Sequence, residues 1–292
     1  MLCPQQRRFS AHWSMVEDGA VPAGNFGRYM ARNCCTDILG DRTPPRTQDK
    51  LWKLRPAVDK LHQRFFAGRS LPTVFRFDAN VLSSTCRRNT TLMFMPDKTY
   101  RYGSKMFMTC DPRNAYFHRF EMYAGKRRHD NRARFASNRH PWHVSVVDRF
   151  YTSMPLCVEL LAMNIYIIGT VMINRLGLNP PVKEKGATRP VSIPRVSFKF
   201  ARSVAIPSMV MLHWWDRKPV HYMCTGAVMS GSSINRNAKQ VGPISVGCPG
   251  AVTDYQRWMG SVDVHDQLRL QKYSFQTSTK FIKYYKSLFF AL

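Results

Sequence analysis

The chain has 292 residues, of which 44% are hydrophobic and 12% aromatic, so it can bury a substantial core. Its 44 Lys and Arg residues face only 18 Asp and Glu, which gives a formal charge of +26. So much positive charge attracts a polyanion, and we expect the partner to be nucleic acid. The basic residues are spread along the chain and form no basic amphipathic helix, which argues against a membrane partner.

Eight cysteines are scattered through the chain without a C-x-x-C pair: Cys3, Cys34, Cys35, Cys86, Cys110, Cys157, Cys224 and Cys248. This spacing argues against a disulfide framework and against a zinc site, and it fits reduced thiols in an intracellular protein. No apolar signal-peptide core opens the sequence. The most apolar window, 156–173, is interrupted by polar residues and a glycine. We therefore expect a helix over 155–163 and a buried strand over 165–174 there, not a membrane span.

Two segments precede the first predicted strand. Residues 1–48 are rich in Gly, Pro and Arg and predict a poorly ordered N-terminal segment. Residues 49–70 carry apolar side chains at helical spacing, and Pro56 is compatible with a helix that begins there. We interpret 49–70 as a partial helical region that serves DNA binding or dimerisation.

Four strands are predicted next. Alternating apolar and polar residues over 73–78 predict a half-buried strand that ends on an acid. Strands are expected at 103–110 and 116–124, with a turn between them. A short apolar run over 143–148 predicts the fourth strand, which also ends on an acid.

The second half of the chain is less regular. Residues 175–209 hold many Pro, Lys and Arg residues without a clear period, which indicates an irregular insertion. Segments 210–215 and 220–225 predict a hairpin, and a loop rich in Gly, Ser and Asn is expected over 226–249. A helix is expected to open after the Gly-Ser pair at 260–261.

This order of elements is that of an RNase H-like core, an α/β fold with a mixed sheet flanked by helices. In that fold the first and fourth strands lie side by side, so their acids would lie near an acid on a packed helix. We therefore assign a first part of the core to 71–174 and a second part to 210–270. Residues 271–292 are interpreted as a truncated C-terminal helical region.

Four acids are candidates for the site: Asp78, Asp148, Asp263 and Asp266. The last two are three residues apart, which places them on one face of a helix. Hard divalent cations prefer oxygen ligands, and two such ions about 3.5–4 Å apart can activate a water and stabilise a leaving oxygen at phosphorus. Asp78 also fits the cap of a turn, and Asp266 also fits a solvated helix face.

Two motifs carry a family resemblance. The stretch 254–270 contains M-G-S-V-D-V-H-D-Q and resembles the piggyBac transposase signature, which is roughly Y-N-x-x-M-G-G-V-D-x-x-D-Q. Residues 148–153 match five of the six positions of that family's D-N-F-Y-T-S element. The strand over 73–78 resembles the family's first acidic strand. The resemblance extends from about Phe26 to Leu292.

The resemblance implies a DNA-binding protein that nicks and joins DNA at TTAA targets in transposition. It implies that Asp78, Asp148 and Asp263 bind Mg²⁺ or Mn²⁺ and that Asp266 is an accessory catalytic acid. The implied partner is the double-stranded DNA of transposon ends. The resemblance also implies a nuclear protein, and it is compatible with a homodimer.

Several positions depart from the family pattern. Ala79 replaces an acid, Arg149 replaces Asn, and Ser261 replaces the second Gly. Segment 80–88 lacks the family's P-F-K-G-R core, and 126–142 lacks the apolar spacing of a crossover helix, which a parallel strand requires. These departures predict weak or absent catalysis. The alternative is a catalytically inactive, domesticated or decaying DNA-binding protein, and a basic RNA-binding or scaffold protein is a third class.

Basic residues supply candidate phosphate contacts, namely Lys126, Arg127, Arg128 and Arg149. The first three open a basic run that equally fits a solvated loop or a nuclear-import patch. The tail over 280–292 mixes basic and aromatic residues at helical spacing. It predicts a packed amphipathic helix and not a base-stacking surface.

Overall fold

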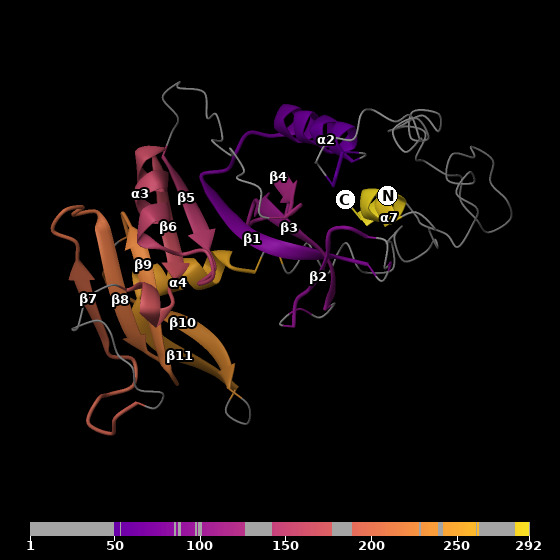
Figure 1. Ribbon diagram of the computed structural model, residues 1–292. Helices are drawn as coiled ribbons and strands as arrows, with labels where there is room; N and C mark the ends of the chain where they lie inside the picture. Colours follow the sequence, from indigo (N-terminus) through magenta and orange to yellow (C-terminus); the bar gives the residue numbers. More distant parts are fainter. Residues whose placement is uncertain are drawn as a thin grey trace, which may run out of the picture.

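A computed structural model of the protein describes most of the chain from residue 50 onward (Figure 1). The described residues are 50–52, 54–84, 86, 89–96, 98, 101–125, 142–176, 189–227, 229–238, 242–260, 262 and 284–291. The predictions for 1–48 and for the crossover connection at 126–141 therefore lie outside the described residues.

Within the described residues, nine strands form one mixed sheet and two more form a separate hairpin. The sheet consists of β1 (Val74–Ser83), β2 (Leu92–Phe94), β3 (Tyr102–Cys110), β4 (Phe117–Met122), β5 (His143–Val147), β6 (Ile165–Thr170), β7 (Phe198–Arg202), β8 (Met209–Trp215) and β9 (Pro219–Thr225). The hairpin consists of β10 (Gly231–Ala238) and β11 (Gly242–Pro249).

Five of the strands form the core in the order β4-β3-β1-β5-β6. β1 runs antiparallel to β3 and parallel to β5, and β5 runs parallel to β6. The helix α3 (Met154–Ala162) makes the crossover between the parallel strands β5 and β6. This is the arrangement of the RNase H-like fold, so the predicted fold class is confirmed: α/β, with a mixed sheet flanked by helices.

Most predicted elements of the core are present. α2 (Arg55–Gly68) carries a proline in its first turn, where the missing N–H has no partner to lose. The predicted strands correspond to β1, β3, β4 and β5, and the predicted hairpin corresponds to β8 and β9. In the tail, α7 (Tyr284–Ala291) is a helix with buried residues, which confirms the packed helix expected there.

Two loop predictions are wrong. The stretch 226–249 contains the β10–β11 hairpin, in which the apolar residues Ile234, Val246 and Cys248 are buried. Gly, Ser and Asn indicate a loop, but β11 has apolar residues at every second position and β10 pairs with it along its whole length. The insertion at 175–209 contains β7, whose side chains are mostly exposed and therefore show no hydrophobic alternation. A 3₁₀ helix, η3 (Ile173–Arg175), precedes it.

The sequence does not indicate the helix that precedes residues 260–261, and the helix expected after them lies outside the described residues apart from Val262. α4 (Gly250–Trp258) follows β11 directly, and Pro249 occupies its N-cap in an extended conformation. Proline just before a first turn is compatible with a helix, so the Pro-Gly pair is a helix start and not a loop signal. Ala251, Val252 and Tyr255 are buried against the sheet.

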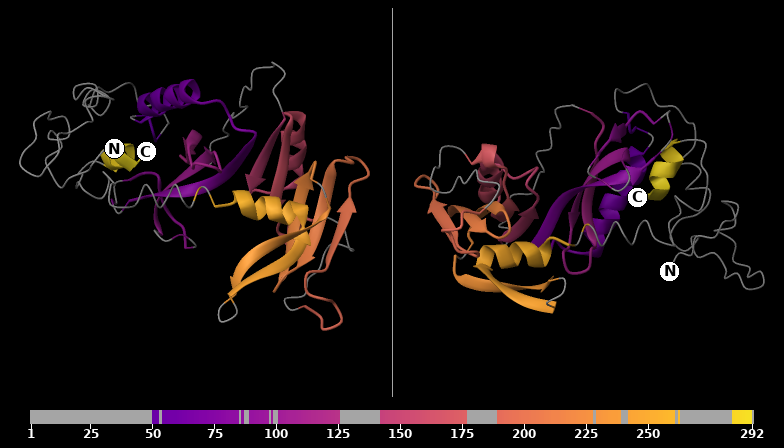
Figure 2. Two further views of the ribbon diagram at one scale, coloured as in Figure 1. Left: turned by 180° about the vertical axis from the view of Figure 1, so that it is seen from behind. Right: turned by 90° about the horizontal axis from the view of Figure 1, so that it is seen from below.

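Helices cover both faces of the sheet (Figure 2). On one face α2 and α7 bury Leu54, Val58 and Leu288 against Met106 and Phe120 of β3 and β4. On the same face α4 and the β10–β11 hairpin cover β5, β6, β8 and β9. α3 lies on the opposite face, as a comparison of Figures 1 and 2 shows.

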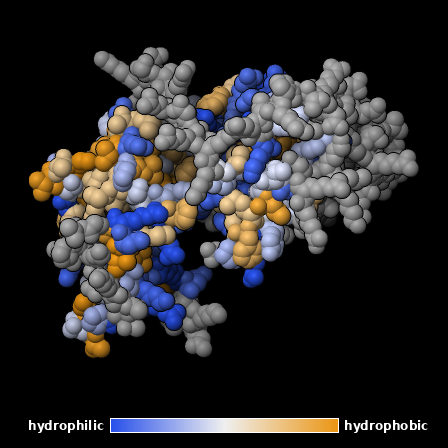
Figure 3. Space-filling model, viewed as in Figure 1, coloured by the Kyte–Doolittle hydropathy of each residue, from blue (hydrophilic) through white to orange (hydrophobic). Residues whose placement is uncertain are grey.

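Hydrophobic residues also gather on the surface over α3 and the neighbouring β7–β9 strands (Figure 3). They include Val158 of α3 and Phe198 and Phe200 of β7. Among the described residues, no helix combines the length and the apolar character needed to cross a membrane.

Candidate functional site

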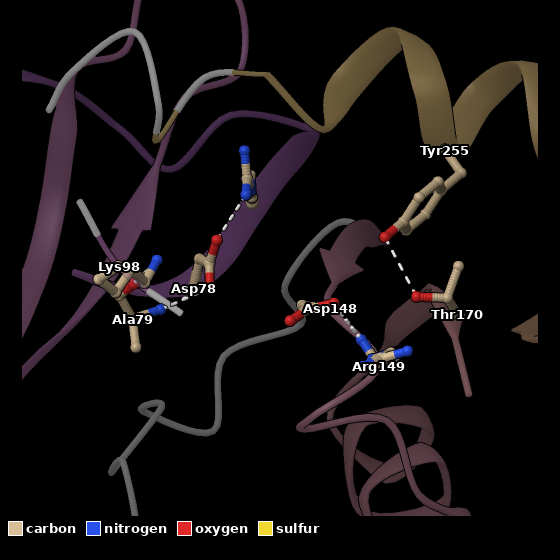
Figure 4. A network of polar contacts seen from close by, with 8 residues as sticks. Asp78, Ala79, Lys98, Asp148, Arg149, Thr170 and Tyr255 are labelled. Atoms are coloured by element: carbon tan, nitrogen blue, oxygen red, sulfur yellow. Dashed lines mark hydrogen bonds and ion pairs between the residues drawn. The ribbon is translucent and has the colours of Figure 1, made fainter. Parts of the chain in front are cut away.

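The candidate site lies where β5 ends beside β1. The last paired residues of the two strands are Phe77 and Val147, and β1 continues to Ser83 without β5 beside it. Asp78 and Asp148 directly follow that pair and line one pocket of about 280 Å³ (Figure 4). The two acids are therefore brought together as expected for neighbouring strands. The prediction that Asp78 ends its strand is wrong, because β1 extends five residues beyond it.

Asp78 is a buried acid whose two oxygens both accept hydrogen bonds. Oδ1 accepts the backbone N–H of Ala79 at 2.7 Å, and Oδ2 accepts Nη2 of Arg76 at 2.5 Å. The side chains of Arg76 and Asp78 are only 3% and 11% exposed. They lie two residues apart on a strand and therefore on the same face of the sheet.

Asp148 begins a tight turn that leads into α3. Its Oδ1 accepts the backbone N–H of Arg149 at 2.5 Å. Its carbonyl oxygen accepts the N–H of Tyr151 at 3.0 Å, the N–H of Thr152 at 3.2 Å and the hydroxyl of Thr152 at 3.0 Å. Ser153 then caps α3 by accepting the N–H of Leu156 at 3.4 Å. Backbone and side-chain bonds together fix the acid at the end of β5.

Two tyrosines are in electrostatic range of both acids. Burial raises the pKa of Tyr151, and the negative charges of Asp78 and Asp148 raise it further. Burial also raises the pKa of Tyr255 on α4, and the same acids add to this effect against the hydrogen bond from Thr170. The hydroxyls of Tyr255 and Thr170 are 3.2 Å apart (Figure 4). Tyr255 therefore places α4 within electrostatic range of both acids.

Sequence reasoning missed two lysines in this pocket. Nζ of Lys98 donates to the carbonyl oxygen of Ala79 at 3.1 Å. Lys105 lies on β3 opposite Val81 and also lines the pocket. Burial lowers the pKa of Lys105, and the charge of Lys98 lowers it further while Asp78 works against the shift.

The described part of the pocket has carboxylate oxygens, which are the donors that Mg²⁺ and Mn²⁺ prefer. However, Asp78 is paired with the buried Arg76, and Lys98 and Lys105 line the pocket beside the two acids. No group of three or more His, Cys, Asp or Glu side chains among the described residues could hold a metal ion. Among the described residues alone, these two acids and their neighbouring cations do not make up a site for a pair of divalent metal ions.

Several predicted site residues lie outside the described residues: Asp263, Asp266, Lys126, Arg127 and Arg128. Arg149 is described and exposed, next to Asp148. Val262, which precedes Asp263, is buried in the same core as Leu82 of β1 and Met106 of β3.

An RNase H-like sheet with two acids at the junction of its first and fourth strands defines the class of nucleases and transposases that share this core. The sequence matches the model of the transposase family described as Transposase IS4 over residues 28–292. The chain therefore belongs to this transposase family. Transposases of the family generally use a divalent metal.

The fold also matches a solved structure, the cryo-EM structure of a piggyBac transposase synaptic complex with hairpin DNA. The TM-score is 0.64 at 20% sequence identity, and the match covers 83% of this chain. This chain spans only about half of that transposase, since the match covers 50% of it. No curated protein matches the sequence.

Proposed function

We propose that the chain is a transposase-derived protein that binds double-stranded DNA at transposon ends. One observation supports this most strongly: the family match extends through the whole RNase H-like core in a chain of formal charge +26. A basic surface attracts the phosphate backbone whatever the base sequence. We extend the proposal to a nuclear protein that binds DNA as a homodimer.

Titration of a labelled duplex across salt concentrations tests the proposal. We expect log K to fall linearly with log salt, with a slope of about 0.9 for each phosphate contacted, and little difference between duplex sequences. A flat plot would contradict phosphate-dominated binding. Equal affinity for RNA of the same length would instead favour a basic RNA-binding protein.

The basic run at the start of segment 126–142 is proposed to contact phosphates. The triple variant Lys126→Gln, Arg127→Gln and Arg128→Gln is expected to lower the slope by up to about three units. The matched control removes three charges that are exposed at the β7–β9 end of the sheet, with Lys199→Gln, Arg217→Gln and Lys218→Gln. Equal effects of both triple variants would exclude a specific role for the basic run.

Metal-dependent DNA strand cleavage is a second candidate function. It is favoured by the single pocket that Asp78 and Asp148 share. We propose that Asp263 is the third carboxylate of this pocket and Asp266 an accessory acid, supported by the burial of Val262 on the face that carries Asp78. A structure with DNA bound in which the carboxylates lie more than about 10 Å apart would contradict this grouping.

Cleavage is expected to be weak or absent. Ala79 replaces the acid that directly follows the first aspartate in the family. Asp78 itself accepts a hydrogen bond from Arg76. The measurement is nicking of supercoiled DNA with Mg²⁺ or Mn²⁺. Nicking by the wild type that disappears in an Asp148→Asn variant would establish an active enzyme and exclude the inactive alternative.

A further inference from the structure

Arg76 places a positive charge directly beside Asp78 of the candidate site. Its side chain is 3% exposed, and its guanidinium donates to Asp78 Oδ2 at 2.5 Å. A guanidinium is a cation that donates hydrogen bonds and accepts none. The same strand therefore supplies both the acid and its counter-cation.

The other oxygen of Asp78 is also bonded, to the backbone N–H of Ala79. Each oxygen keeps a second lone pair, but a metal ion bound there would lie next to a buried guanidinium of the same positive sign. We propose that Arg76 takes the place of a divalent metal at Asp78, and that the pocket binds a phosphate of DNA without metal. The proposal rests on the DNA-binding function proposed above.

The two lysines identify the class of ligand. Lys98 uses one N–H on the carbonyl oxygen of Ala79, and an ammonium group has three. Lys105 Nζ lies 5.0 Å from the ring centre of Phe107 and 4.8 Å from that of Phe150. The repulsion that lowers the pKa of Lys105 comes in part from Lys98. A phosphate between the two ammonium groups would relieve this repulsion, whereas a metal ion would increase it.

Exposed aromatic rings indicate that the DNA strand bound in the pocket is unpaired. Phe94 and Phe150 both line the pocket, and each is 53% exposed. Exposed rings beside lysines form a stacking platform for bases of any sequence. Bases in a duplex are already stacked on one another, so only an unpaired strand can use these rings. The ligand is therefore a single-stranded DNA segment or a frayed DNA end.

The first test measures Mn²⁺ binding to the full chain by calorimetry in the absence of DNA. We expect that any Mn²⁺ binding by the wild type is unchanged by Asp78→Asn. Arg76→Met is expected to gain at least about tenfold in Mn²⁺ affinity, and Asp148→Asn added to it should abolish the gain. If Arg76→Met does not fold, the wild type decides the matter. Mn²⁺ binding by the wild type that is lost in Asp78→Asn would overturn the proposal.

The second test measures binding of a short labelled oligothymidine in EDTA. The double variant Lys98→Gln and Lys105→Gln, and separately Phe150→Ala, are expected to weaken binding roughly tenfold. The charge-matched control is Lys199→Gln with Lys218→Gln, both exposed residues at the β7–β9 end of the sheet.

The outcomes separate this inference from the proposed function. In one outcome, the pocket variants and the control bind oligothymidine equally while duplex binding persists. That result would overturn the proposed pocket for single-stranded DNA, but it would leave the proposed DNA-binding function intact. If oligothymidine binding required a metal ion, the proposal that the pocket binds a DNA phosphate without metal would also be overturned. Failure to bind either DNA at any salt concentration would overturn both proposals. Competition by inorganic phosphate at similar concentration would identify a free anion, and not a DNA strand, as the ligand.

Discussion

Gly169 of β6 lies against the turn that holds Asp148. A Cβ added there would be 2.3 Å from Oγ1 of Thr152 and 3.0 Å from the carbonyl oxygen of Val147. Thr152 is fully buried and donates to the carbonyl of Asp148, so it has no room to move. We expect Gly169→Ala to lower the free energy of unfolding by about 1–3 kcal/mol in urea titrations. Gly231→Ala is the control, because nothing lies within 4 Å of its Cβ; an equal loss in both variants would contradict this packing.

His118 gives stability a dependence on pH. Burial lowers its pKa below the ordinary value of 6.5, and Nε2 has no hydrogen-bond partner among the described residues. The unfolded chain therefore binds more protons at acidic pH, and stability should be complete above about pH 6.5 and decrease as the pH falls below it. Burial lowers the pKa of His62 in the same way. Unfolding of wild type and His118→Phe at about pH 7.5 and 5.5 checks this, since the variant should lose less stability on acidification. Identical losses would contradict the assignment to His118.

The residues of the site differ in how far sequence could reveal them. Arg76 and Asp78 are two apart in a predicted strand, so their shared face follows from the alternation alone. Their burial does not, because it depends on helices that pack later in the chain. Lys105 reaches the pocket only through the register of β1 and β3, which pairs it with Val81. Strand register is set by tertiary packing, and a single sequence does not give it.

The β10–β11 hairpin is joined to the main sheet by an ion pair. Arg236 donates to Asp216 Oδ2 at 2.5 Å, and its guanidinium lies 5.5 Å from the ring centre of Trp214. Burial raises the pKa of Asp216, but hydrogen bonds and charges from Arg236 and Arg195 together lower it below its usual value. The ion pair therefore anchors an element that would otherwise be held only by α4 and a few apolar side chains.

Arg236→Ala is expected to loosen this hairpin locally. Hydrogen exchange of amides in β10 and β11 should accelerate, while exchange in β1 stays unchanged. Arg195→Ala is the matched control, because Arg195 contacts the same carboxylate at 3.3 Å but is 53% exposed. Exposed pairs contribute little, so a small effect is expected there. Faster exchange throughout the sheet in Arg236→Ala would show that the hairpin does not open as a separate unit.

Elements with a strong hydrophobic period were predictable, and elements that depend on their neighbours were not. α2, α3 and the strands of the core show their periods in the sequence, and each is present. β7 is an edge strand with mostly exposed side chains, so its main determinant is the backbone pairing with β8. Backbone pairing leaves no mark on side-chain pattern. The irregular insertion was expected for this reason, and the structure corrects it.

The charge of the whole molecule opposes its own folding. With 44 basic and 18 acidic residues, like charges repel one another more in the compact state than in an extended chain. Salt screens this repulsion, because the Debye length falls from about 30 Å at 0.01 M to about 10 Å at 0.1 M. We therefore expect the Tm of the free protein to rise when NaCl is increased over this range.

The DNA complex should respond to salt in the opposite direction. Duplex DNA that binds the folded state raises Tm by mass action, and this gain depends on the release of counterions, which salt suppresses. The Tm with excess DNA should therefore start higher at low salt and fall towards the value of the free protein as NaCl increases. Thermal unfolding followed by circular dichroism with and without DNA measures both curves. Parallel curves would show that the excess of positive charge does not contribute to DNA binding, and a free-protein Tm that does not rise with NaCl would contradict self-repulsion.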